Sequence, residues 1–174
     1  PCVLIRSSAR LRNRYMASHR ASESVWDYPR PPSVVPDDRE VVVILGDQEI
    51  VRTTSAVRVL ETSHPPTFYV PVRDIADGVL SPTSRTTICE FKGAASYWDV
   101  VAGGVRSPAS AWGYERPRPG YESLTGMVAF YPGHMDSCTV GGETVAAQAG
   151  DFYGGWITPE IEGPFKGAPG TMGW

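Results

Sequence analysis

Short runs of β-branched and aromatic residues alternate with turn signals over most of the chain. Gly46-Asp47 and Gly141-Gly142 each separate two such runs, a pattern typical of β-hairpins. The other runs are bounded by proline or glycine, which interrupt regular structure. We expect strands at 40–45, 48–54, 67–71, 86–91, 96–101, 110–114, 127–131, 136–140 and 143–147. Many short strands separated by turns predict an all-β fold, built of antiparallel strands in a single compact domain.

Two segments depart from this pattern. Ser55 to Glu61 is the best candidate for a short helix, because Ala56, Val57 and Leu60 fall on one side of it. A helical turn is also expected at 74–80. Both elements are too short to change the predicted fold class.

Composition and charge narrow the function classes. The 174 residues include 18 Gly and 16 Pro, which disfavours a helical bundle. The formal net charge of -3 gives no support to a nucleic-acid partner, and no apolar run approaches the roughly 20 residues of a membrane span. Cys2, Cys89 and Cys138 are too widely spaced for a disulfide framework. We therefore expect a soluble, cytoplasmic protein with reduced thiols.

The opening of the chain is rich in arginine and free of acidic residues. We interpret Met16 as the natural start and residues 1–15 as vector-derived or upstream sequence; a transit peptide is the alternative. The Trp- and Pro-rich stretch 26–32 is too aromatic for a plain linker, so we expect it to dock on the body. The predicted boundaries are 1–23 for a flexible N-terminal arm, 24–174 for the single domain, and 150–174 for its Gly- and aromatic-rich C-terminal extension.

Lysine is scarce, and both lysines stand in the same tetrapeptide. The chain has 14 arginines but only Lys92 and Lys166, each within Phe-Lys-Gly-Ala. An ammonium is compact and loses its proton readily when desolvated, unlike a guanidinium. These lysines therefore suit contact with an anion or carbonyl, or service as a nucleophilic amine. The alternative is a lysine that pairs with a carboxylate beside a glycine turn.

Glu61 and His64 are the best candidates for proton transfer. They lie three residues apart at the end of the predicted helix, a spacing that can place both on one face. Pro65-Pro66 fixes the direction in which the chain leaves. A carboxylate beside an imidazole raises its pKa and orients its ring. Alternatively, Glu61 pairs with an arginine such as Arg58, and His64 caps the helix end.

Five aromatic residues fall on three of the predicted strands: Tyr69, Tyr97, Trp98, Trp112 and Tyr114. Neighbours along a strand point to opposite faces, so Tyr97 and Trp98 diverge, whereas Trp112 and Tyr114 share one face. These side chains could wall a cleft for a flat or cationic ligand. The alternative is ordinary core and cross-strand packing.

Several motifs resemble the domain of unknown function 427 family. They are LETSHPPTFYVP at 60–71, CEFKGAASYW at 89–98, AWGY at 111–114, GGWI at 154–157 and GPFKG at 163–167. The resemblance spans about 24–174 and implies a β-tent domain similar to Mss4-like domains. Those relatives often hold zinc with paired cysteines. Because such pairs are absent here, the resemblance does not imply a zinc site in this chain. The family also has a nucleotidyltransferase-like label, but the Gly-Ser and Asp-x-Asp pattern that would hold Mg²⁺ is missing.

Together these observations predict one aromatic-lined cleft that binds a small molecule. Glu61 and His64 would transfer protons and Lys92 would stabilise an anion or carbonyl, if the protein is an enzyme. We expect no metal, no cofactor, and no nucleic-acid or membrane partner, and we leave a homodimer open. Two other hypotheses stand beside this one: a protein-interaction module without catalysis, and a nucleotidyltransferase-like enzyme with carboxylates converging on a metal.

Overall fold

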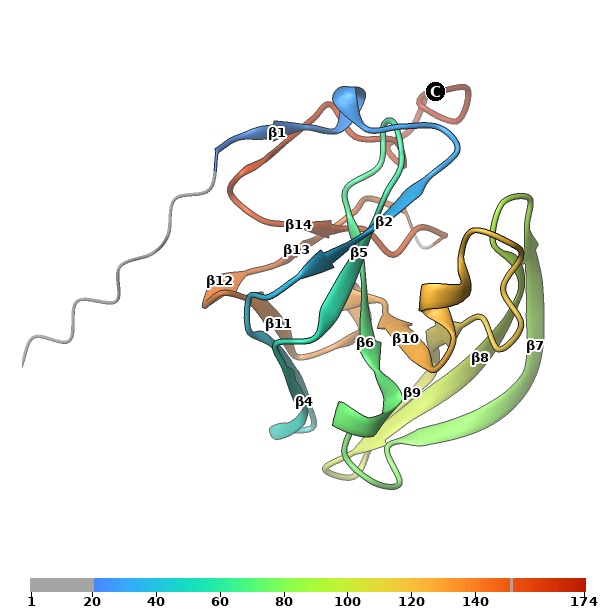
Figure 1. The fold of residues 1–174 in the computed structure, drawn as a ribbon. Coiled ribbons are helices and arrows are strands. Elements are labelled where there is room, and N and C mark those ends of the chain that lie inside the picture. Colours follow the sequence, from blue (N-terminus) through green and yellow to red (C-terminus); the bar gives the residue numbers. More distant parts are fainter. Residues whose placement is uncertain (1–20, 151) are drawn as a thin grey trace, which may run out of the picture.

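The computed structural model describes residues 21–150 and 152–174, which form β-strands joined by turns and short 3₁₀ helices (Figure 1). The expected all-β fold of antiparallel sheets is confirmed. Most of the predicted N-terminal arm, with Met16 and residues 1–15, lies outside the described residues. At its end, Glu23 already belongs to a strand. Among the residues that the structure covers, no helix has the length and apolar character needed to cross a membrane.

Seven strands form the larger sheet, and each is antiparallel to its neighbours. The long strands at one edge curve away from the rest of the molecule (Figure 1). The segment expected at 96–101 lies within them, whereas those expected at 86–91 and 110–114 end earlier than predicted, at Cys89 and Gly113. From edge to edge the order is β2 (Ser33–Asp37), β5 (Ala56–Leu60), β6 (Thr67–Pro71), β10 (Met127–Phe130), β9 (Val105–Gly113), β8 (Gly93–Ala102) and β7 (Leu80–Cys89).

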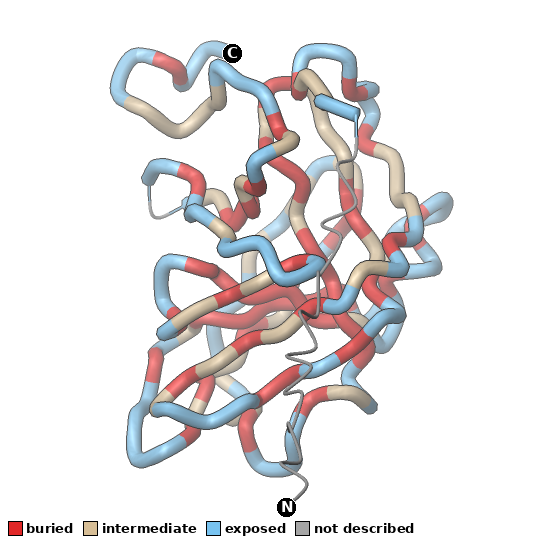
Figure 2. The backbone as a smooth tube through the Cα atoms, turned by 90° about the vertical axis from the view of Figure 1, so that its left-hand side faces the viewer, coloured by how far each residue is buried: buried red, intermediate tan, exposed pale blue. Residues whose placement is uncertain are grey.

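A smaller, four-stranded sheet packs against one face of the larger one. Its order is β12 (Glu143–Thr144), β11 (Ser137–Val140), β3 (Val41–Leu45) and β4 (Gln48–Thr53). The predicted hairpin between β3 and β4 is confirmed: Gly46 and Asp47 have φ of 59° and 58°, as a type I′ turn requires. Apolar side chains of both sheets interdigitate between them, and buried residues concentrate in the middle of the molecule (Figure 2).

β5 occupies the segment in which we expected a helix, so that prediction was wrong. The strand pairs with β2 on one side and with β6 on the other. Val57 and Val59 are β-branched and suit a pleated surface, and pairing along both edges outweighs a weak helical pattern. The helical turn expected at 74–80 is also displaced, because the 3₁₀ helix η2 covers Val72–Asp74 and β7 begins at Leu80.

The N-terminal stretch and the C-terminal extension pack together on the body. Trp26 lies 5.5 Å from the ring of Trp174, and its indole N–H donates to the Pro164 carbonyl at 3.0 Å. The stretch 26–32 therefore docks as expected. The remaining short elements are β1 (Glu23–Ser24), which pairs in parallel with β15 (Ile161–Glu162), β13 (Ala146–Ala147), which pairs with β14 (Trp156–Ile157), and the 3₁₀ helices η1 (Val25–Asp27), η3 (Glu122–Leu124) and η4 (Pro132–His134).

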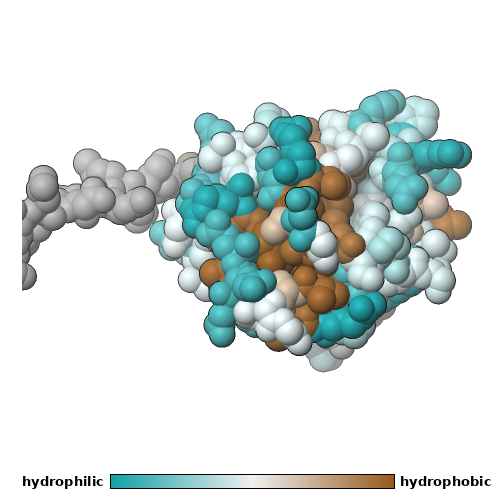
Figure 3. Space-filling view, turned by 90° about the horizontal axis from the view of Figure 1, so that it is seen from below, coloured by the Kyte–Doolittle hydropathy of each residue, from teal (hydrophilic) through white to brown (hydrophobic). Residues whose placement is uncertain are grey.

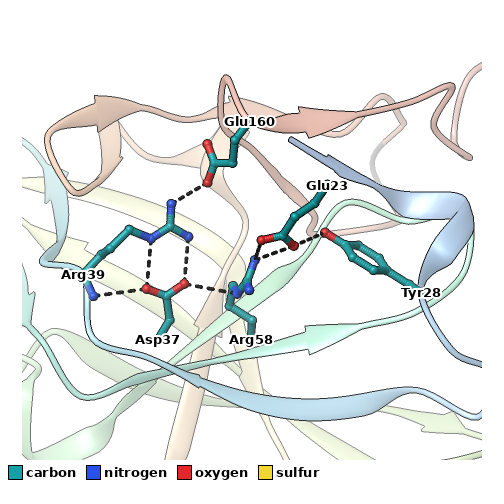
Figure 4. A network of polar contacts seen from close by, with 6 residues as sticks. All are labelled: Glu23, Tyr28, Asp37, Arg39, Arg58 and Glu160. Carbon is teal, nitrogen blue, oxygen red and sulfur yellow. Dashed lines mark hydrogen bonds and ion pairs between the residues drawn. The ribbon is translucent and has the colours of Figure 1, made fainter. Parts of the chain in front are cut away.

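A chain of ion pairs, which we call the arginine network, joins three segments that are distant in the sequence (Figure 4). Asp37 accepts hydrogen bonds from Arg39 at 2.9 and 2.7 Å, and its carboxylate lies 3.1 Å from Nε of Arg58 on β5. Arg58 also donates to Glu23 of β1 at 3.1 Å, and Arg39 pairs with Glu160. Each charge in the arginine network faces an opposite charge, so Glu23 and Glu160 are both held at the β2–β5 side of the large sheet.

The two faces of the large sheet carry different side chains. On β6, Phe68 and Val70 point into the core between the sheets, whereas Tyr69 belongs to a second apolar cluster on the opposite face. Ala111 and Trp112 divide in the same way on β9. The strand alternation thus collects large aromatic side chains on the face that the small sheet does not cover.

Candidate functional site

A cavity of about 370 Å³ opens over the aromatic face of the large sheet. This volume lies in the range of sites for small molecules. Its walls come from the strands of the sheet, from the β5–β6 and β7–β8 turns, and from the C-terminal extension. Seven of the residues proposed from the sequence line it: Glu61, His64, Tyr69, Lys92, Tyr97, Trp112 and Tyr114.

The floor of the cavity is aromatic. The Trp112 ring lies 4.4 Å from that of Tyr131 and 6.1 Å from that of Tyr69, which it meets edge-on. The Trp112 indole N–H donates to the Tyr69 hydroxyl at 3.1 Å. Burial raises the pKa of Tyr69, Tyr114 and Tyr131 above its ordinary value, so these hydroxyls stay neutral at physiological pH. The Tyr131 hydroxyl donates to the Phe152 carbonyl and the Tyr114 hydroxyl to Tyr69, so the floor offers flat apolar surface together with the uncharged O–H donor of Tyr69.

Trp98 is the sequence candidate that the structure places elsewhere. It follows Tyr97 on β8 and so points to the other face of the sheet, where it packs against the core between the two sheets. Tyr97 lies on the aromatic face, and its hydroxyl hydrogen-bonds with that of Thr87 at 3.0 Å. Of the two neighbours, Tyr97 is a cavity wall and Trp98 is core packing.

Lys92 lies in the three-residue turn between β7 and β8 and lines the cavity. The turn ends at Gly93, whose φ of 101° favours glycine. Lys92 is 8% exposed, and no described residue forms a hydrogen bond or ion pair with its ammonium. Its backbone N–H contacts the Cys89 thiol sulfur at 3.5 Å. The ammonium keeps contact with solvent through the cavity, so it is available to a partner from outside the protein.

Lys166 lines the same cavity, so both lysines of the chain meet there. Its backbone N–H donates to the Ser63 carbonyl at 2.8 Å, which fixes the C-terminal extension to the β5–β6 turn. Its ammonium donates to the Trp174 backbone oxygen at 2.7 Å and lies 5.8 Å from the centre of the Tyr153 ring. Unlike Lys92, Lys166 has partners within the protein.

Glu61 and His64 lie in the β5–β6 turn rather than on a helix. The His64 backbone N–H donates to the Glu61 carbonyl at 3.0 Å, and Ser63 between them has φ of 69°. The Glu61 carboxylate accepts a hydrogen bond from Arg30 at 3.3 Å, and not from Arg58. The His64 ring is oriented by the Thr62 carbonyl at Nδ1, 3.0 Å away, and not by Glu61.

The electrostatic state of His64 follows from its surroundings. Burial lowers its pKa below the ordinary 6.5, and the hydrogen bond to the Thr62 carbonyl and the charge of Glu61 offset this only in part. The ring is therefore neutral at pH 7. Since a carbonyl only accepts hydrogen bonds, Nδ1 carries the proton and Nε2 has the free lone pair. His64 thus offers the cavity a hydrogen-bond acceptor and a potential base.

Arg30 is a site residue that the sequence reasoning missed. It donates to Glu61 at 3.3 Å and to Glu90 at 2.9 Å, and its guanidinium lies 5.3 Å from the centre of the Phe91 ring. It thereby links the β5–β6 and β7–β8 turns at the cavity rim. No local signal indicates this, because its partners are far away in the sequence. The other missed lining residues used below are Tyr131, Gln148, Phe152, Tyr153 and Gly154.

The described cysteines differ in their surroundings. Cys138 is buried in the core between the sheets, and burial raises its thiol pKa to about 12. Cys89 is half-buried at the cavity beside Lys92. Over residues 21–150 and 152–174, no group of three or more His, Cys, Asp or Glu side chains is placed to hold a metal ion.

The interaction-module hypothesis requires an apolar surface patch. On the end of the molecule seen in Figure 3, apolar side chains gather in the middle and polar ones surround them. Val72 and Val105 are among the exposed apolar residues of the described chain. Apolar patches of a few hundred Å² are ordinary on single-chain proteins, so this surface alone does not favour a partner protein.

Comparison with known proteins identifies one family. Residues 33–141, more than half of the chain, match the model of a domain of unknown function (DUF427), which carries a nucleotidyltransferase label. The matched region includes the aromatic floor and Lys92, whereas Lys166 and Tyr153 lie beyond it. A comparison with curated proteins finds no match. The chain belongs to the DUF427 family.

Proposed function

We propose that this protein binds a small molecule in the cavity over its aromatic sheet face. Supporting this are the volume of about 370 Å³, the aromatic floor and the polar groups at the rim. Distant segments supply these groups, because Glu61, Lys92 and Lys166 come from the β5–β6 turn, the β7–β8 turn and the C-terminal extension. The β-tent topology and the cytoplasmic location remain predictions.

The observation that carries the proposal is Lys92, a largely buried residue whose ammonium faces the cavity. At other buried charges of the described chain, such as Arg58 and Asp37, an opposite charge lies at about 3 Å. Lys92 is 8% exposed but has no such partner among the described residues. Buried cations are ordinarily paired. A ligand that fills the cavity would supply the missing partner.

His64 is the group best suited to proton transfer if the bound molecule reacts. Its neutral ring presents Nε2 as an acceptor, and its pKa is shifted toward the neutral form by burial. Glu61 accepts a hydrogen bond from Arg30. In this proposal it therefore holds Arg30 at the cavity rim and does not act on the His64 ring. Lys92 would stabilise negative charge on the bound molecule.

A ligand screen by thermal shift and tryptophan fluorescence tests the proposal, because Trp112 lies in the cavity floor. The screen includes nucleotides with Mg²⁺, for which the nucleotidyltransferase hypothesis predicts a metal-dependent shift. We expect Lys92→Arg to abolish binding of the hits and to change Tm by no more than a few degrees. Arg73→Gln, at an exposed position outside the cavity, is the control and should bind normally. Hits that bind Lys92→Arg as tightly as the parent protein would place the ligand elsewhere.

A further inference from the structure

We infer that the ligand is a small aromatic monoacid, whose carboxylate contacts Lys92 and whose ring lies on the aromatic floor. This inference rests on the proposed function and specifies the chemistry of the molecule that occupies the same cavity. Three independent features of the cavity lead to it: its charge balance, its uncharged donors and acceptor, and its apolar rim.

The charge balance leaves one positive charge without a partner. Among the described lining residues, three cations face two carboxylates, since His64 is neutral. Arg30 pairs with both Glu61 and Glu90, and the Lys166 ammonium is bound to a backbone oxygen. The Lys92 ammonium is left over. A single negative charge neutralises this excess, whereas a nucleoside triphosphate would bring several more charges than the cavity can pair.

The polar groups that line the cavity with Lys92 suit a carboxylate attached to an aromatic ring. Tyr69 and Tyr114 keep their hydroxyl protons, because burial raises their pKa, and the Tyr114 hydroxyl donates to that of Tyr69. The Tyr69 hydroxyl accepts from the Trp112 indole, so its own hydrogen remains for a further acceptor. An ammonium and an O–H donor that line the same cavity can together stabilise an oxyanion. The ring of such a ligand would face Trp112 and Tyr131, whose centres lie 4.4 Å apart.

Exposed apolar side chains at the rim of the cavity favour a ligand with an apolar body. Ile88 and Phe152 are 80% and 70% exposed, and both line the cavity. They come from the β7–β8 hairpin and from the C-terminal extension, so they belong to separate walls of the cavity. Large apolar side chains this exposed at a cavity lose contact with water when an apolar ligand covers them. A compact inorganic anion would leave them uncovered.

The test compares acids with their neutral amides. Benzoate and 2-naphthoate are titrated against benzamide and 2-naphthamide, with inorganic phosphate as an anion that lacks a ring. Binding is followed by calorimetry and by the indole N–H signal of Trp112 in NMR spectra. A charged hydrogen bond in a sheltered site predicts that each acid binds at least about 10-fold more tightly than its amide. Phosphate should bind weakly, since it cannot cover the aromatic floor.

Variants separate this inference from the proposed function. Lys92→Met should remove the preference for acids and leave amide binding within about 2-fold, and Lys92→Gln repeats the test if the methionine variant does not fold. Lys166→Met is the matched control, for which we expect a smaller loss because that ammonium already has a protein partner. Amides that equal acids, or acids that ignore Lys92→Met, would overturn the inference while the cavity remains a binding site. If no compound moves the Trp112 signal and none from the screen binds, the proposed function fails as well.

Discussion

The arginine network and the cavity both contain buried charged side chains, but they satisfy them in opposite ways. In the arginine network, Asp37 is fully buried between Arg39 and Arg58, and each of these arginines reaches a second carboxylate (Figure 4). In the cavity, Lys92 is 8% exposed, and its ammonium faces the cavity and has no such contact among the described residues. The first arrangement is complete within the chain, and the second is complete only with a bound molecule.

The choice of cation follows the same division. A guanidinium presents several donors in a rigid fork, and the arginine network uses this: Arg39 binds Asp37 with two nitrogens and Glu160 with a third. An ammonium is a compact charge on a flexible stem, which adapts to a ligand that arrives and leaves. The difference explains why a chain with 14 arginines has its two lysines at the cavity.

Breaking the arginine network should give the largest effect. Asp37→Ala leaves Arg58, whose side chain is 7% exposed, without one of its two carboxylates. Removing one partner of a buried ion pair typically costs about 3–5 kcal/mol, because the other charge stays buried. Urea denaturation measures this loss. Glu40→Gln breaks an exposed pair with Arg52 and should cost less than about 1 kcal/mol. Equal losses in both variants would mean that the buried network is no more important than surface pairs.

A methyl group at Gly154 tests whether the cavity floor depends on close packing. The added Cβ would lie 2.0 Å from Cη2 of Trp112, so the indole must move. Overpacking of this kind costs about 1–3 kcal/mol and would disturb the floor on which the ligand ring lies. We therefore expect Gly154→Ala to weaken acids and amides alike in calorimetry. Gly173→Ala meets nothing within 4 Å and is the control. Normal binding by Gly154→Ala would show that Trp112 does not contact the ligand.

Replacing Lys92 should not lower the free energy of unfolding, whereas breaking the arginine network should. Lys92→Met removes a buried charge and leaves no partner stranded, so stability should be unchanged or rise by about 1 kcal/mol. Arg58→Met removes a cation that pairs with both Asp37 and Glu23 and leaves Asp37 with Arg39 as its one remaining arginine, so it should be destabilising. Both are measured by denaturation without ligand. A large loss in Lys92→Met would mean that the lysine is structural and that the contrast between the two regions is false.

The sequence predicted the strands well because their signals are local. Gly46-Asp47 determines a hairpin through its own backbone angles, and β6 and β10 are short continuous apolar runs. Ser55 to Glu61 was misjudged because strand formation there depends on β2 and β6, which lie outside any local window. Local propensity is overridden when both edges of a segment are paired.

The site was predictable where composition or alternation carried the signal. The scarcity of lysine pointed to Lys92 and Lys166, and strand alternation separated Tyr97 from Trp98. Tyr131 could have been found the same way, since it shares a face with Ala129 at the end of β10. Arg30 could not, because its role arises only where two distant turns come together.

Protonation of His64 at low pH should give the smallest effect. It links the stability of the protein to the affinity of the cavity for acids. Because burial lowers the His64 pKa, the folded protein takes up this proton less readily than the unfolded chain. Between the lowered pKa and 6.5 the unfolded state holds more protons, so stability falls as the pH drops through this window. The protonated ring would, however, add a positive charge to the cavity and attract an acid more strongly.

Stability and acid binding should therefore move in opposite directions on acidification. Between pH 7.5 and 5.5, the parent protein should lose more Tm than His64→Gln, while its affinity for 2-naphthoate rises and that of the variant stays level. The other two histidines of the chain are common to both proteins, so any contribution from them cancels in the comparison. The Glu61 and Glu90 carboxylates of the cavity both pair with Arg30. If affinity falls with stability, the acid does not sense the charge of His64, and its carboxylate lies on another side of the cavity.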